Sequence, residues 1–292
     1  MSCLFNDLIH YTKSFDVYLK RSTQQIAHFK IIENNLLSVL ERTWNFNQFP
    51  DVFNVLDVGC GDGTGGDFLI FENIEKISPV SSKKPILFLQ AVEPRADSLA
   101  SFQASAESWA KQNSEIDLCV QCFDGSWEEY RSKTKQHPTK FHLINFIQSL
   151  YFLGVEDTLR DCITNHLADR GVIFCLIANC NCPMIRFQKA FNIPILTSHT
   201  SSDVVSIARK NGWRYDCFDV PYKIDITGVF NKSNMEGNLL LDFISHKKHY
   251  RMETNQLEME QVEKYLLNDS EVDDDGKRKL VGLISAVTIY KS

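Results

Sequence analysis

The sequence predicts an α/β fold with a doubly wound, mainly parallel sheet, and three observations indicate it. Apolar runs of strand length alternate with segments of helical periodicity, which is the pattern of strand–helix–strand units. A glycine-rich turn, residues 59–65, follows the first of these runs. The next run ends in an acid, Glu93. Because ligands of open α/β sheets bind beyond the carboxyl ends of the strands, the turn and the acid also mark a candidate binding site.

The strands are predicted where apolar residues run continuously, as they do in strands buried on both faces of a parallel sheet. They cover residues 52–58, 86–92, 118–123, 141–147, 171–178, 213–220 and 280–290. Helices are predicted to run from Asp67 through Ile74 and over residues 157–168. The run 200–203 is predicted to cap a further helix, which continues through Arg209 and stops at Asn211-Gly212.

Two stretches fall outside this alternation and are predicted to form a smaller, mostly helical lobe. Residues 1–45 carry apolar positions at spacings of three and four, which indicates two helices. Residues 222–276 contain the apolar run 238–244 and a polar helical run at 257–267. The large α/β domain then comprises residues 46–221 and 277–292. The lysine-, serine- and proline-rich residues 78–85 are predicted to be an insertion before the second strand.

Composition excludes several classes of partner. The 292 residues are enough for one large domain and a smaller lobe, and 43% hydrophobic with 23% charged residues is ordinary for a globular protein. A net charge of −6 argues against binding to nucleic acid or to anionic membranes. No apolar run is long enough to cross a bilayer, and the N-terminus lacks the apolar core of a signal peptide.

The nine cysteines are an odd number scattered through apolar segments, which predicts reduced thiols in a cytosolic protein. The cluster Cys180-Asn181-Cys182 has no second close pair or histidine near it in the sequence, so no zinc site is predicted there.

The chemistry of the turn depends on its glycines, Gly59, Gly61 and Gly63. They alternate with other residues behind the apolar strand that ends Val-Leu-Asp-Val. Such glycines let the backbone adopt positive φ and let a ligand approach closely. The pattern matches neither the phosphate-binding P-loop nor a full dinucleotide fingerprint, so phosphate binding is not the first interpretation. A carboxylate at position 93 can accept hydrogen bonds from both hydroxyls of a ribose. The alternatives are a purely structural turn and a solvated charge at the end of a strand.

The glycine turn resembles motif I of the class I S-adenosylmethionine-dependent methyltransferases, which have a Rossmann-like, seven-stranded sheet. That resemblance implies that the final strand is antiparallel and lies in a hairpin at the edge of the sheet. Longer patterns are similar to the histamine N-methyltransferase family over nearly the whole chain. They lie at residues 4–23, at Val92-Glu93-Pro94, at residues 147–152, at 200–203, at 215–219 and at 237–243.

The resemblance implies a set of cofactor-binding residues. Gly59 matches the glycine that opens the S-adenosylmethionine loop, with Gly61 and Gly63 behind it, and Glu93 matches the acid that binds the ribose. Ile147 lies at the end of the fourth strand, where the family contacts the cofactor. Ser126 lies in the segment near the adenine, and Ser98 stands where the family has a longer glutamine.

The resemblance implies the substrate-binding residues only in part. Gln148 keeps a substrate-contacting glutamine, and an aromatic box for a flat ring comprises Tyr11, Phe15, Tyr151, Phe187 and Phe243. Gln24, however, replaces a glutamate, Leu283 is the nearest match to an asparagine, and Pro183 replaces a tryptophan. Because a polar pocket built for one ligand rejects others, the loss of an anionic and a polar partner favours a substrate related to histamine.

The predicted function is S-adenosylmethionine-dependent N-methylation of a small amine or imidazole by a cytoplasmic monomer. The cofactor carries the reactivity and the protein supplies alignment, so no catalytic residue is named; an imidazole with a pKa of about 6.5 needs little help from a base. His10, His28, His142 and His199 are interpreted as structural or surface residues. Histamine is the first substrate considered. The alternatives are a histidine derivative, a dipeptide such as carnosine or another amine, and a cofactor-binding protein without turnover.

Overall fold

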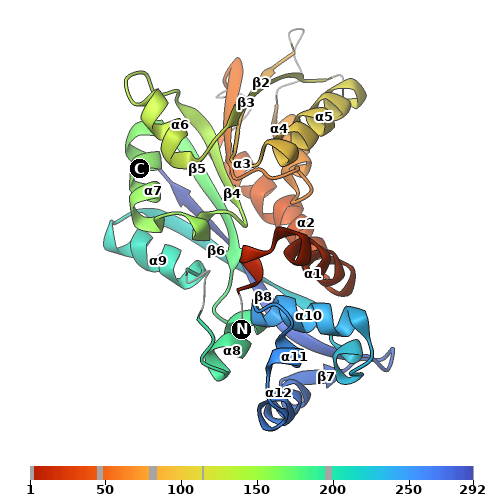
Figure 1. The fold of residues 1–292 in the computed structure, drawn as a ribbon. Helices are drawn as coiled ribbons and strands as arrows, with labels where there is room; N and C mark the ends of the chain where they lie inside the picture. The colour runs from red at the N-terminus through yellow and green to blue at the C-terminus, as the bar shows by residue number, and fades with distance from the viewer. Residues whose placement is uncertain (1–2, 45–48, 79–83, 114, 195–198, 292) are drawn as a thin grey trace. The chain divides into compact units, whose positions relative to one another are not determined.

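The computed structural model describes residues 3–44, 49–78, 84–113, 115–194 and 199–291 (Figure 1). The chain forms two compact units. The helical unit comprises Met1–Ala27, Asn179–Leu196 and Val220–Ile284. The sheet unit comprises His28–Ala178, Thr197–Asp219 and Ser285–Ser292. No helix among the described residues has the length and apolar character that crossing a membrane requires.

The described strands form one eight-stranded sheet with the order β3-β2-β1-β4-β5-β8-β6, and the short β7 pairs with β8. The strands are β1 (Val52–Val58), β2 (Ile86–Glu93), β3 (Asp117–Asp124), β4 (Phe141–Ile147), β5 (Leu167–Ala178), β6 (Arg214–Asp225), β7 (Ser270–Val272) and β8 (Arg278–Tyr290). The predicted α/β class is therefore confirmed, and β1 to β5 lie in parallel pairs.

The register of the parallel strands brings their carboxyl ends to one edge of the sheet. Val55 of β1 lies opposite Leu89 of β2 on one side and opposite Leu143 of β4 on the other. Val58, the last residue of β1, pairs with Val92, so Glu93 follows at the level where the glycine turn begins. The two features that the sequence singled out thus meet at the same edge.

The helices of the described residues are α1 (Leu8–Arg21), α2 (Gln24–Ile31), α3 (Leu37–Thr43), α4 (Asp67–Ile77), α5 (Ala96–Gln112), α6 (Trp127–Thr134), α7 (Val155–Asp161), α8 (Pro183–Ala190), α9 (Ser201–Lys210), α10 (Met235–Ser245), α11 (Tyr250–Glu253) and α12 (Gln256–Asn268). Short 3-10 or π turns lie at Leu4–Asn6, Ile32–Leu36, Leu150–Phe152, Cys162–His166 and Thr227–Phe230.

Both faces of the sheet are covered, as a doubly wound fold requires. Figure 1 shows α4 and α5 on one side of the central strands and α6 and α7 on the other. Successive residues of a strand point to opposite faces. Leu56 and Val58 of β1 accordingly join the buried cluster that contains Trp127 of α6 and Leu159 of α7.

The predicted strands are all present, some with longer bounds, but two details differ from the prediction. The final long strand, β8, pairs with the edge strand β6, so this pair lies at one edge of the sheet as predicted, with β8 on its inner side. The short β7 was not predicted. The helix predicted over residues 157–168 ends at His166, because Leu167 pairs with Phe141 and starts β5. The predicted insertion at 78–85 lies mostly outside the described residues.

Capping side chains explain where several helices begin. Thr200 forms a reciprocal capping box with Asp203 at the start of α9, and Gly212 follows its end with φ of 68°, as predicted. In the helical unit, α1 contacts α10, and α10 contacts α8 and α11. At Gly237 of α10, an added Cβ would lie 2.1 Å from the carbonyl oxygen of Gly228, so only glycine allows this close approach.

Candidate functional site

The glycine turn after β1 is held in a left-handed backbone conformation. The φ angles are 72° at Gly59, 57° at Gly61 and 82° at Gly63. A Cβ on Gly59 would lie 2.5 Å from the Cβ of Ser149, so that glycine is required by packing within the protein. A Cβ on Gly61, in contrast, would meet no atom of the described residues within 4 Å beyond its two chain neighbours. Gly61 therefore borders open space, which makes it the glycine best placed to report on a bound ligand.

Glu93 fastens the turn to the end of β2. Its side chain is buried, with 7% exposure. One carboxylate oxygen accepts a hydrogen bond from the backbone N–H of Gly61 at 3.1 Å, and the other accepts from the N–H of Arg95 at 3.1 Å. Each carboxylate oxygen can accept more than one hydrogen bond. Glu93 therefore orients the turn and keeps the capacity to accept from two further donors, such as a pair of ribose hydroxyls.

The other residues predicted around the cofactor follow the ends of neighbouring elements. Ile147 ends β4 and is 8% exposed, and its Cγ2 atom would lie 3.0 Å from a Cβ on Gly65. Ser126 is half-buried after β3 and caps α6 through a reciprocal capping box with Glu129. Ser98 is half-buried in the first turn of α5.

Two buried carboxyl groups beside the turn were not singled out as site residues. Asp57, in β1, and Asp67, which begins α4, are both almost completely buried. Burial, the charge of Asp67 and a hydrogen bond to it raise the pKa of Asp57 well above the usual value. Burial also raises the pKa of Asp67. The available signal was an aspartate inside an otherwise apolar strand, which is costly unless a partner or a ligand compensates for it.

The acids also determine the state of the neighbouring thiol. Cys60 is buried, and its pKa is raised by burial first and then by the charges of Asp57, Asp67 and Glu93. A thiol in this state stays protonated and is a poor nucleophile. Cys60 is therefore not a candidate nucleophile.

Asp57 leads to a prediction about pH. Because its pKa is raised in the folded protein, the folded state binds that proton more tightly than the unfolded chain does, and stability falls as pH rises above the ordinary value of 3.8. Asp57→Asn cannot ionise and removes this loss. The free energy of unfolding of the variant, minus that of the natural protein, should increase between about pH 4 and about pH 7 in urea denaturation. A difference that stays constant with pH would contradict the prediction.

In the helical unit, three of the predicted aromatic residues lie together. The rings of Tyr11 and Phe15 are stacked with centroids 5.9 Å apart, and Phe243 of α10 lies 5.6 Å from Phe15 and 6.1 Å from Tyr11. Tyr11 and Phe15 are half-buried. Phe187 does not join them. Its fully buried ring contacts Phe191, Tyr250 and Tyr265.

Three further substitutions noted in the sequence also belong to the helical unit. The Tyr18 hydroxyl donates a hydrogen bond to Oε1 of Gln24 at 2.8 Å, which leaves the amide N–H groups of Gln24 as its outward donors. Leu283 is half-buried in β8. Pro183 begins α8 and packs against β8, where a Cβ on Gly282 would lie 2.4 Å from it.

In the sheet unit, Gln148 has an unusual backbone. Its φ is 54°, and its N–H donates to the carbonyl of Leu176 at 2.8 Å, directly beyond β4. Positive φ is uncommon for residues other than glycine and is often found at functional positions. Nε2 of Gln148 lies 3.5 Å from Nε2 of His28, a buried histidine whose pKa is lowered by burial to about 4. His28 is therefore neutral. Tyr151 is half-buried and contacts Phe152, with ring centroids 4.6 Å apart.

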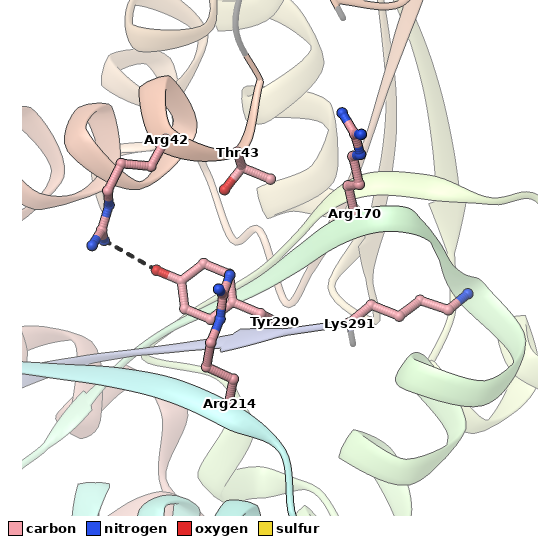
Figure 2. Close-up of a pocket in the computed structure, with 6 residues that line it drawn as sticks. All are labelled: Arg42, Thr43, Arg170, Arg214, Tyr290 and Lys291. Carbon is pink, nitrogen blue, oxygen red and sulfur yellow. Dashed lines mark hydrogen bonds between the residues drawn. The ribbon is translucent and has the colours of Figure 1, made fainter.

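Figure 2 shows a basic pocket of the sheet unit. Its volume is about 240 Å³, and its lining residues are Arg42, Thr43, Arg170, Arg214, Tyr290 and Lys291. Arg42 precedes β1, and Arg170 lies near the start of β5, whereas the glycine turn follows the end of β1. Arg42 donates to the Tyr290 hydroxyl at 3.2 Å and to Asp216 at 2.8 Å. None of the residues predicted to bind cofactor or substrate lines this pocket.

The chain is similar to curated enzymes over most of its length. It is 24% identical over 255 residues to histamine N-methyltransferase of Rattus norvegicus, which covers 84% of this chain and 82% of the relative. It is also 24% identical over 264 residues to histamine N-methyltransferase of Danio rerio, which covers 85% of this chain and 83% of the relative. The resemblance predicted from the sequence is confirmed, and so is methyltransferase as the class of enzyme. No protein-family model matches the chain.

Solved structures of methyltransferases are also similar to it. The plantazolicin methyltransferase BpumL in complex with SAH covers 99% of this chain and 93% of its own, with 14% identity and a TM-score of 0.47. Magnesium protoporphyrin IX methyltransferase from Synechocystis PCC 6803 covers 67% and 77%, with 13% identity and a TM-score of 0.42.

Proposed function

We propose that this chain, a relative of the histamine N-methyltransferases, transfers a methyl group from S-adenosylmethionine to a nitrogen of a small imidazole or amine. The observation that carries the proposal is the glycine turn joined to the Glu93 carboxylate at the carboxyl edge of the parallel strands. When bound, the cofactor supplies the electrophilic methyl group of a sulfonium. The protein supplies binding and alignment.

The residues present fit S-adenosylmethionine better than a phosphate-bearing nucleotide. Three carboxyl groups lie around the turn: those of Asp57, Asp67 and Glu93. Burial raises the pKa of Asp57 and of Asp67, so the Glu93 carboxylate is the charge that would repel phosphate and attract the sulfonium or ammonium of the cofactor. Glu93 can accept from the ribose hydroxyls, and open space at Gly61 allows close approach to the backbone. Ile147, Ser126 and Ser98 are proposed as further contacts.

The residues of the protein orient the substrate and exclude water from it. Gln148 can form a hydrogen bond with a substrate nitrogen. His28, which lies beside it, is neutral and adds no positive charge to the substrate site. Tyr11, Phe15 and Phe243 offer apolar ring surface to a flat substrate, and Tyr151 and Leu283 are proposed as lesser contacts. A displacement at carbon gains most from holding the nucleophile in line, so no general base is assigned. Phe187 is buried among other rings, which supports a packing role more than contact with substrate.

Gln24 supports a second candidate substrate class, a histidine derivative or a dipeptide. Its carbonyl oxygen already accepts from Tyr18, and its amide N–H groups are the donors that it offers to a substrate. Those donors suit a carbonyl or carboxylate of the substrate, whereas the ammonium group of histamine would have to share the one carbonyl oxygen with Tyr18. Other amines and a cofactor-binding protein without turnover are the remaining alternatives.

A radiolabelled methyl-transfer assay over a panel of amines, imidazoles and histidine dipeptides tests the function. Transfer to at least one imidazole or amine, with the label on nitrogen, is expected. Cofactor binding without transfer to any member of the panel would favour the protein without turnover. Absence of cofactor binding by calorimetry would overturn the proposal altogether.

Position 24 leads to a prediction about specificity. Gln24→Glu keeps the acceptor for Tyr18 and replaces the amide nitrogen by a charged oxygen, so the local structure is retained. A charge-assisted hydrogen bond in place of a neutral one is worth on the order of 1–2 kcal/mol, or about tenfold. The natural protein should therefore turn over histamine weakly, and the variant should do so with a kcat/KM about tenfold higher.

Steady-state kinetics with histamine would measure this effect. Gln25→Glu makes the same change one residue along α2 and controls for the added charge. A low micromolar KM for histamine in the natural protein, made worse by Gln24→Glu, would show that position 24 does not report a changed substrate.

We also propose that the protein is located in the cytoplasm and that it is a monomer. All nine cysteines are free, as they are in a reducing compartment. Cell fractionation and light scattering would test these two points; an oligomer in solution would contradict the second.

A further inference from the structure

Three side chains of types that bind metals converge in the helical unit, and none of them is among the residues assigned above to the cofactor. Nε2 of His10, on α1, lies 2.8 Å from Oδ2 of Asp242, on α10. The ring of His249, which immediately precedes α11, lies 4.8 Å from the ring of His10, centroid to centroid. One ligand atom from each of the three residues lies within 4.8 Å of the other two. Two imidazoles and one carboxylate thus face one another.

The carboxylate is held in place before any ligand arrives. Asp242 is buried, with 3% exposure. Its Oδ1 accepts from the N–H of Tyr250 at 2.7 Å, and its Oδ2 accepts from the N–H of His249 at 3.0 Å. Backbone donors of this kind fix the direction of a metal-ligating carboxylate and leave it a further lone pair.

The backbone conformation of His249 supports the arrangement. Its φ is 54°, in the left-handed region that residues other than glycine seldom occupy. This conformation directs two successive N–H groups, those of His249 and Tyr250, at Asp242. The imidazole of His249 is exposed, so it can move by the small amount needed to bring its nitrogen closer to the other two ligands.

We propose that His10, Asp242 and His249 form a binding site for a divalent transition-metal ion, and that Zn²⁺ is the ion it takes. Imidazole nitrogen suits transition metals and not Mg²⁺ or Ca²⁺, which take oxygen ligands. Zn²⁺ has no geometric preference from its d electrons and is bound by three protein ligands and a water in many sites. The exposed side of His249 leaves room for that water.

The competing explanation is a simple ion pair between His10 and Asp242 that joins α1 to α10. It accounts for the short contact of those two residues. It gives no role to the ring of His249, whose centroid lies 4.8 Å from that of the His10 ring. The sequence did not predict the site, because His10 and Asp242 are separated by 232 residues.

Isothermal titration of the full-length, metal-free protein with Zn²⁺ tests the site. One equivalent should bind, and His249→Asn should weaken that binding at least tenfold. Asparagine is chosen because it tolerates the left-handed conformation that position 249 requires. His137→Asn, at an exposed histidine of the sheet unit, is the matched control and should leave the affinity unchanged.

Two further measurements separate this site from binding to thiols and from misfolding. Cobalt bound at the site should show d–d absorption without a thiolate charge-transfer band, and Cys180→Ser should not alter the titration. Zn²⁺ should raise the Tm of the natural protein more than that of His249→Asn, because a metal that binds only the folded state stabilises it. Three results would each overturn the proposal. They are a titration in which no equivalent of Zn²⁺ binds tightly, a Zn²⁺ affinity of His249→Asn equal to that of the natural protein, and a thiolate charge-transfer band that is lost in Cys180→Ser.

Discussion

Replacing Glu93 by alanine is expected to weaken S-adenosylmethionine binding by a few kcal/mol, on the order of a hundredfold or more. Two charge-assisted hydrogen bonds to the ribose are removed, each worth about 1.5–3 kcal/mol. The variant also releases the N–H of Gly61, which Glu93 holds at 3.1 Å, so the glycine turn loses its anchor. Calorimetric titration with the cofactor measures the loss.

Glu93→Gln separates these two effects. A glutamine retains the shape, but only one of its terminal atoms accepts, so it can bind the N–H of Gly61 or that of Arg95, and it carries no charge for the ribose. Its affinity should lie between those of the natural protein and Glu93→Ala, and unfolding in urea measures its change in stability separately. If Glu93→Ala binds the cofactor as tightly as the natural protein, the ribose role of Glu93 is wrong and the acid only fastens the turn.

Replacing Gly61 by valine is expected to abolish cofactor binding while the fold is retained. The backbone at φ of 57° is strained for any residue with a Cβ, and more so for a β-branched one, by about 1–2 kcal/mol. Apart from Gly61 and its two chain neighbours, no atom of the described residues lies within 4 Å of the added Cβ, so the side chain enters space that we assign to the cofactor. Binding by calorimetry and unfolding in urea are the two measurements.

Gly212 offers a matched control for the strain. Its φ is 68°, and it too has no atom within 4 Å of an added Cβ. It follows α9, far along the chain from the turn. Gly212→Val should therefore cost similar stability and leave cofactor affinity unchanged. Equal losses of affinity in the two variants would mean that Gly61→Val acts through backbone strain alone. The cofactor would then bind elsewhere than beside Gly61.

The sequence predictions were correct where the determining residues are close together along the chain, and wrong where they are far apart. The glycine turn and the capped helix α9 were predicted because their determinants lie within a few neighbouring residues: alternate glycines in one case, Thr200 and Asp203 in the other. The apolar runs predicted β1 and β4 with their observed bounds, because burial on both faces of a parallel sheet selects such runs. The prediction of a helix over residues 157–168 was wrong at its end, because Leu167 pairs in the sheet with Phe141, which lies 26 residues earlier.

What the sequence by itself determined is the α/β class, the glycine turn and the acid that follows the second strand. Only the tertiary structure showed that β8 lies between β5 and β6. The apolar pattern of β8 is compatible with several positions in the sheet. It also decided that Phe187 packs with Tyr250 rather than with Tyr11, and that His10 meets Asp242. These contacts join residues far apart along the chain, and their geometry arises from how the helices pack, which a local pattern does not encode.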